Sequence, residues 1–143
     1  MIRHMFTIIF SIRLWLRMTF TLIYLSIVAD LSLLPSNDFP ELPLFPGADK
    51  IIHSCMYLGL TWLTCWSFQA ESKRNQYYYI FLFSVSWGAI MELLQLFMHQ
   101  GRSFELLDIF SNLVGTFAGL LFYIFMARYK EKPEIKRADN NLH

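Results

Sequence analysis

Residues 106–127 read LLDIFSNLVGTFAGLLFYIFMA, a run that contains one acidic residue, Asp108, and no basic residue. At the rise of an α-helix this run extends over about 33 Å, close to the ~30 Å hydrocarbon core of a bilayer. Asp108, Asn112, Gly115 and Gly119 follow one another at intervals of three or four residues and therefore share one helix face. The stretch predicts a transmembrane helix whose polar and small-residue face packs into a helical bundle.

Three further apolar stretches precede this one, at residues 18–34, 51–68 and 77–98. The chain has 143 residues, of which 55% are hydrophobic and only 16% are charged, which is poorer in charge than a typical soluble domain. Because the last two links are short, neighbouring helices should run antiparallel. We predict an all-α polytopic membrane protein with an up-down four-helix transmembrane bundle at 18–127, a cytoplasmic segment at 1–17 and a flexible cytoplasmic tail at 128–143.

The basic residues predict the orientation of this bundle, because lysine and arginine beside short loops are retained on the cytoplasmic side. Ten of the twelve fall on one side of the predicted spans, and only Lys50 and Arg102 fall on the other. Both termini are therefore predicted to be cytoplasmic. The net charge of +1, with basic residues scattered beside the spans, gives no reason to expect a nucleic-acid partner.

Polar residues gather at the predicted outer ends of the last three spans. Each span carries a pair at helical spacing: Asp49 with His53, Glu92 with Gln95, and Asp108 with Asn112. Gly88 precedes Glu92 by four residues and allows a close neighbour on the same face. Charged side chains are costly within a bilayer, so these carboxylates should pair or reach water. The expected counter-charges are Lys50, His53 and Arg102.

Four separated segments resemble the VanZ-like family, membrane proteins named after a glycopeptide-resistance accessory protein. The segments are DKIIH at 49–53 followed by Tyr57, ELLQ at 92–95, GRSF at 101–104 and DIFSNLVG at 108–115. The resemblance implies a bacterial cytoplasmic (inner) membrane protein, and for the named member it implies teicoplanin resistance, but it supplies no reaction. Its motif positions fall on Asp49, Lys50, His53, Glu92, Gln95, Arg102, Ser103, Asp108 and Asn112. The residues before Gly101 depart from the family, which often has proline there.

These observations lead to a functional hypothesis, with alternatives that stay open. We expect these nine residues to form an outward-facing polar pocket that binds a lipid head group or cell-envelope precursor, linked in some members to glycopeptide resistance. In the pocket Lys50 and Arg102 would bind phosphate or carboxylate. An intramembrane enzyme using Glu92 or Asp108 as general acid or base is one alternative, and a purely structural or assembly protein is another.

Two further types of site, a serine nucleophile and a metal site, are less well supported interpretations of the same residues. No elbow motif supports Ser103 as a nucleophile with His53 as base. A mixed metal site at Asp49, His53, Glu92 and Asp108 is conceivable chemistry, but no second histidine lies nearby, so no metal and no cofactor are expected. The sequence predicts membrane lipids as partners and leaves the oligomeric state open.

Overall fold

The computed structural model describes residues 8–33, 47–69, 74–98 and 106–131, and all regular structure within these ranges is helical. The four long helices are α2 (Leu14–Leu33), α3 (Ala48–Phe68), α4 (Arg74–Met98) and α5 (Leu106–Glu131). They overlap closely with the four apolar stretches of the sequence. The largest differences are that α2 begins four residues before the predicted start of the first span and that α5 ends four residues after the predicted end of the last.

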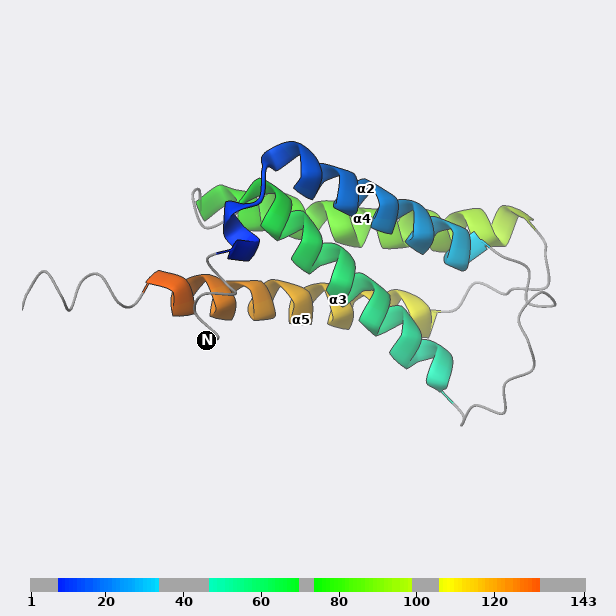
Figure 1. The fold of residues 1–143 in the computed structure, drawn as a ribbon. Helices are drawn as coiled ribbons and strands as arrows, with labels where there is room; N and C mark the ends of the chain where they lie inside the picture. The colour runs from blue at the N-terminus through cyan, green and yellow to red at the C-terminus, as the bar shows by residue number, and fades with distance from the viewer. Residues whose placement is uncertain (1–7, 34–46, 70–73, 99–105, 132–143) are drawn as a thin grey trace, which may run out of the picture.

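The ends of the helices fall into two groups at opposite ends of the molecule. The beginnings of α3 and α5 and the ends of α2 and α4 lie at one end, and the other helix termini lie at the opposite end (Figure 1). Helix α3 crosses obliquely between the others and contacts α2, α4 and α5 (Figure 1). This arrangement brings together the polar residues that the sequence places early in α3 and α5 and late in α4.

Three of the helices are long and apolar enough to cross a membrane: Leu14–Leu33, Asn75–Met98 and Leu106–Arg128. Helix α3 was also predicted to be a span, but it is less apolar than these three. Its polar residues include Thr61 and Ser67, which are fully buried against the other helices. Because its neighbours cover so much of its surface, α3 needs fewer apolar side chains than a helix that faces lipid on one side.

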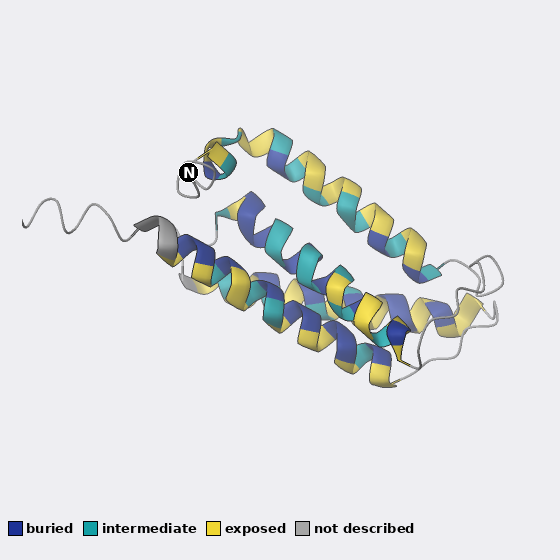
Figure 2. Ribbon diagram, turned by 60° about the horizontal axis from the view of Figure 1, so that its bottom comes forward, coloured by how far each residue is buried: buried dark blue, intermediate teal, exposed yellow. Residues whose placement is uncertain are grey.

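The surface is apolar and much of the interior is polar, which is the reverse of a soluble protein. Large exposed side chains such as Phe97, Phe110 and Phe125 lie on the outer faces of the helices, and Figure 2 shows exposed positions along each outer face. Fully buried positions include Ser84 and Glu92. Lipid is the solvent that suits this distribution, so the fold supports a multi-pass membrane protein.

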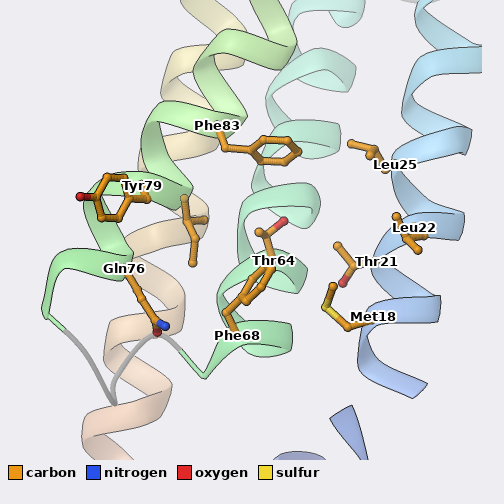
Figure 3. Close-up of a pocket in the computed structure, with 10 residues that line it drawn as sticks. Met18, Thr21, Leu22, Leu25, Thr64, Phe68, Gln76, Tyr79 and Phe83 are labelled. Atoms are coloured by element: carbon orange, nitrogen blue, oxygen red, sulfur yellow. The ribbon is translucent and has the colours of Figure 1, made fainter. Parts of the chain in front are cut away.

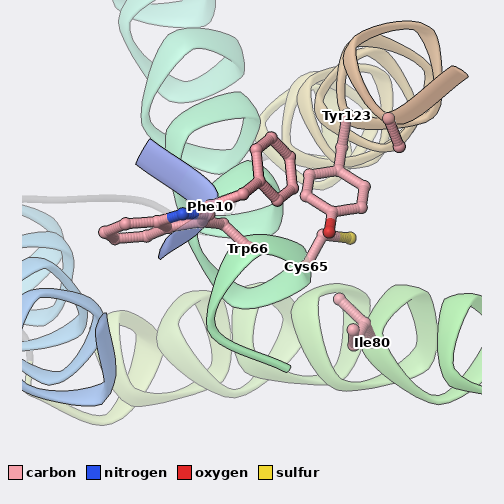
Figure 4. Close-up of a cluster of buried hydrophobic side chains, with 6 residues drawn as sticks. Phe10, Cys65, Trp66, Ile80 and Tyr123 are labelled. Atoms are coloured by element: carbon pink, nitrogen blue, oxygen red, sulfur yellow. The ribbon is translucent and has the colours of Figure 1, made fainter. Parts of the chain in front are cut away.

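An aromatic cluster packs the end of the molecule opposite the polar residues. Its buried members come from every part of the described chain except α2, and they are Phe10, Cys65, Trp66, Ile80, Tyr123 and Ala127 (Figure 4). The Trp66 indole donates to the carbonyl oxygen of Ile9 at 2.9 Å. Residues 8–11 therefore form part of the packed bundle, although the sequence placed them in a segment outside it.

Arg17 forms hydrogen bonds with the last turn of α3. Its side chain is buried, and Nη1 donates to the carbonyl oxygen of Trp66 at 2.8 Å, while the Ser67 hydroxyl donates to the carbonyl oxygen of Arg17 at 2.9 Å. A cation at this position interacts favourably with the helix dipole and with a carbonyl of the last turn, which also accepts from the Gln69 amide N–H at 3.3 Å.

We expect Arg17→Met to lower the free energy of unfolding by about 2 kcal/mol, because a buried charge-assisted hydrogen bond is lost. Unfolding in mixed detergent micelles, followed by circular dichroism, measures the change. Arg13→Met is the matched control, because Arg13 is exposed. Equal stability of the two variants would show that the Arg17 contact contributes nothing to the fold.

Candidate functional site

The close approach of α3 and α5 positions the candidate site. A methyl group at Gly115 would collide with the backbone of Ser54, and one at Gly119 would collide with the backbone of Leu58. The Ser54 hydroxyl also donates to the carbonyl oxygen of Ser111 at 3.0 Å. These contacts confirm the prediction that the glycine face of residues 106–127 packs within the chain.

This contact places polar side chains of the two helices opposite each other. His53 and Asn112 are both buried, and the His53 Nδ1 atom lies 3.1 Å from the Asn112 Oδ1 atom. Each of them is one turn away from a charged residue of the same helix, since Lys50 precedes His53 and Asp108 precedes Asn112. The crossing of α3 and α5 therefore places a charged layer, formed by Lys50 and Asp108, one turn closer to the starts of the two helices than a hydrogen-bonded layer, formed by His53 and Asn112.

Lys50 joins two carboxylates in the charged layer. Its Nζ atom lies 2.6 Å from Asp108 Oδ1 and 2.7 Å from Asp49 Oδ2. The Asp108 side chain is only 12% exposed and the Lys50 side chain 22%, whereas Asp49 is 58% exposed. The pair with Asp108 is therefore the shielded one, where the interaction is strong, and the pair with Asp49 is screened by its surroundings.

Glu92 supplies the third side of the site from α4. Its side chain is 0% exposed, and its Oε1 atom lies 3.9 Å from His53 Nδ1. One ligand atom each from His53, Glu92 and Asp108 can be chosen so that all three lie within 4.8 Å of one another. We use the name polar cluster for the five residues that these contacts bring together: Lys50, His53, Glu92, Asp108 and Asn112.

Among the remaining predicted site residues, the structure describes Gln95 and Asp49. Gln95 is buried, but its Nε2 atom donates to the carbonyl oxygen of Ser32 at 2.6 Å, so it ties α4 to α2. Asp49 lies at the exposed edge, beyond Lys50. Arg102 and Ser103 were also predicted to belong to the pocket, and they lie outside the described residues.

Tyr57 is a neighbour of the polar cluster and is not among the site residues predicted from the sequence. It is fully buried one turn after His53, and a methyl group at Gly88 would lie 3.1 Å from its Cε1 atom and 3.4 Å from the Cβ atom of Asn112. Its hydroxyl has no hydrogen-bond partner among the described residues. Tyr57 follows His53 by four residues and so shares its helix face, and this spacing was the sequence feature that could have identified it as a site residue.

A separate apolar groove of about 370 Å³ opens between α2, α3 and α4. Its lining includes Leu22 and Leu25 of α2, Phe68 of α3 and Phe83 of α4 (Figure 3). These residues lie toward the beginnings of α2 and α4 and the end of α3, which is the end of the molecule opposite the polar cluster. The groove is therefore a separate feature of the lipid-facing surface.

The polar cluster has a distinct chemical character. Its charged groups are one lysine and two buried carboxylates, beside a histidine and an amide. Carboxylates held near an imidazole can bind a cationic group, accept hydrogen bonds or exchange a proton.

Comparisons with known proteins agree with the residue pattern. The VanZ/LLP1 family model matches residues 4–127. The chain is also 33% identical over 99 residues to an uncharacterised protein of the fission yeast Schizosaccharomyces pombe. That match covers 68% of this chain, and the chain spans 60% of the length of the yeast protein. No solved structure matches the chain.

Proposed function

Because the chain belongs to the VanZ/LLP1 family, we propose that it is a multi-pass membrane protein whose polar cluster binds the head group of a membrane lipid. One observation carries this proposal. Five polar or charged side chains from three helices meet in a buried site at one end of the molecule. One or two polar contacts are enough to fix helix register in a membrane, so a cluster of this size indicates a binding function.

We further propose that all four helices cross the membrane as an up-down bundle, with both termini in the cytoplasm. The apolar outer faces and the opposed helix directions support the bundle (Figure 1). The distribution of lysine and arginine supports the orientation. In this arrangement the polar cluster lies near the extracytoplasmic surface of the membrane, where a head group enters without crossing the hydrocarbon layer.

The fission-yeast relative bears on the type of head group. A ligand shared by such distant members would be one that bacterial and eukaryotic membranes both contain, which favours a phospholipid over a cell-wall precursor. The bacterial inner membrane, the envelope precursor and glycopeptide resistance remain predictions from the family resemblance. Arg102 remains the predicted phosphate ligand, because Lys50 is already engaged by Asp49 and Asp108.

Lipid retention tests the proposal. The protein would be purified in mild detergent, and the lipids that remain bound would be identified by native mass spectrometry. We expect one head-group class to be retained by the wild-type protein and to bind at least about tenfold more weakly to Glu92→Gln, because a charge-assisted hydrogen bond from an N–H or O–H donor of the head group to this carboxylate contributes roughly 1.5–3 kcal/mol.

The matched control is Asp30→Asn, which removes an exposed carboxylate on α2. It should retain the lipid as the wild-type protein does. Circular dichroism would establish that all three proteins are folded. Equal retention by folded Glu92→Gln and by the wild-type protein would refute the proposal that the polar cluster binds the head group.

An intramembrane enzyme acting on a lipid-linked substrate is the second candidate. The distance of 3.9 Å between His53 Nδ1 and Glu92 Oε1 favours it, because a carboxylate beside an imidazole is a common acid–base arrangement. In this case the purified protein would convert the retained lipid, and Glu92→Gln would still bind it without turnover. A binding protein would lose the lipid in the same variant.

A further inference from the structure

The three residues that meet at the centre of the polar cluster have the composition of a metal site. His53, Glu92 and Asp108 are buried, come from α3, α4 and α5, and offer one nitrogen and two carboxylate ligands within 4.8 Å of one another. Ligands bound at about 2.0–2.2 Å to one ion are separated by roughly 3–4 Å. The three groups therefore need to shift by only about 1 Å or less to share an ion.

The charges at this position favour a cation. Glu92 and Asp108 bring two carboxylates into a buried site, and within the polar cluster Lys50 is the lysine that faces them, at 2.6 Å from Asp108. The Glu92 Oε1 atom lies 3.9 Å from His53 Nδ1. A divalent ion would balance both carboxylates, and Lys50 could keep its contact with Asp49 at 2.7 Å.

Asn112 gives an independent indication of a ligand. Its side chain is 3% exposed, and its Nδ2 atom has no hydrogen-bond partner among the described residues. The Oδ1 atom of the same amide lies 3.1 Å from His53 Nδ1, so the unpartnered donor lies beside the three ligand groups. A buried N–H donor is costly unless it meets an acceptor, such as an oxygen bound to an ion.

We propose that His53, Glu92 and Asp108 bind one divalent transition-metal ion, with Asn112 donating to an oxygen atom in its remaining coordination position. A ligand set of one imidazole and two carboxylates suits Zn²⁺, Mn²⁺ or Co²⁺ better than Mg²⁺ or Ca²⁺, which prefer oxygen ligands alone. Three protein ligands leave a position for an exogenous oxygen. Lys50 competes with the ion for Asp108.

The metal ion would also explain how the polar cluster binds an anionic head group, an inference that rests on the proposed function. A phosphate head group would occupy the remaining position, so the ion would link the anionic head group to two carboxylates that otherwise repel it. The chemical class of ligand is then a phosphate monoester or diester. A head group without an anionic oxygen would gain little from the ion.

Titration with Co²⁺ tests the site directly, because protein-bound Co²⁺ has visible absorption bands that report its ligands. The purified protein, treated with chelator and then dialysed in detergent, should bind one equivalent of Co²⁺, and Zn²⁺ should displace it. Glu92→Gln and His53→Gln should bind at least about 100-fold more weakly, since each removes a direct ligand. Lys50→Met should bind more tightly.

Asp30→Asn again serves as the control for adventitious binding to carboxylates, and it should match the wild-type titration. Circular dichroism identifies any variant that fails to fold, and the wild-type titration is decisive by itself. No stoichiometric binding by the wild-type protein, or equal binding by folded Glu92→Gln, would overturn the proposal.

A lipid measurement separates this inference from the proposed function. Stoichiometric Co²⁺ binding without retention of any phospholipid would support the metal site and refute lipid binding. Phospholipid retention by a protein that binds no Co²⁺ would support the proposed function and refute the metal site. If both hold, chelator should release the phospholipid and Zn²⁺ should restore its binding.

Discussion

Gly115→Ala is expected to destabilise the bundle by about 3 kcal/mol or more. The added methyl group would overlap the carbonyl group of Ser54 on α3, and no rotation of a side chain can relieve a collision with backbone. The two helices would have to separate, and the hydrogen bond from the Ser54 hydroxyl to the carbonyl oxygen of Ser111 would weaken as well. Overpacking in a well-packed interior typically costs about 1–3 kcal/mol, and a backbone collision lies at the upper end.

The free energy of unfolding in mixed micelles, followed by circular dichroism, measures this effect. Gly119→Ala should behave in the same way, because a methyl group there would meet the backbone of Leu58. Val114→Ala is the matched control, since it trims an exposed side chain on the same helix. Wild-type stability in Gly115→Ala would mean that α3 and α5 do not approach each other as closely as the structure indicates.

The helices themselves could be predicted from the sequence because each is a long apolar run bounded by polar or proline-containing links. The start of α2 could not be predicted from the sequence in this way. Arg17 resembles an interfacial arginine that stays in water, and only the position of the α3 C-terminus shows that it is buried on the carbonyl oxygen of Trp66. Phe10 likewise joins the packed interior through contacts with residues more than fifty positions away.

The composition of the polar cluster could be predicted in part. Helical spacing placed His53, Glu92 and Asp108 on inward faces at the same end, and the structure brings them together. Spacing along one helix gives no information on rotation relative to the neighbouring helices. It therefore could not show that Gln95 turns toward the Ser32 carbonyl on α2. Nor could it show which carboxylate Lys50 contacts.

The contact between Lys50 and Asp108 leads to the second large effect. We expect Lys50→Met to lower the free energy of unfolding by about 3–5 kcal/mol, because it leaves Asp108 with an uncompensated charge in a shielded position. Asp108→Asn should also be destabilising, since it leaves the Lys50 ammonium without its shielded partner. Asp49→Asn should have little effect, because Asp49 is 58% exposed and a surface pair contributes at most about 1 kcal/mol.

A double-mutant cycle distinguishes this interaction from general damage to the fold. In chelator-treated protein, the combined variant Lys50→Met with Asp108→Asn should regain most of the stability lost in Lys50→Met, since neither charge remains. The coupling energy should be about 2–3 kcal/mol, from unfolding in mixed micelles at low ionic strength. Additive losses would show that the two side chains do not interact, and Asp108 would then need another cation. That outcome would strengthen the case for a metal ion, whereas strong coupling would identify Lys50 as the group with which the ion must compete.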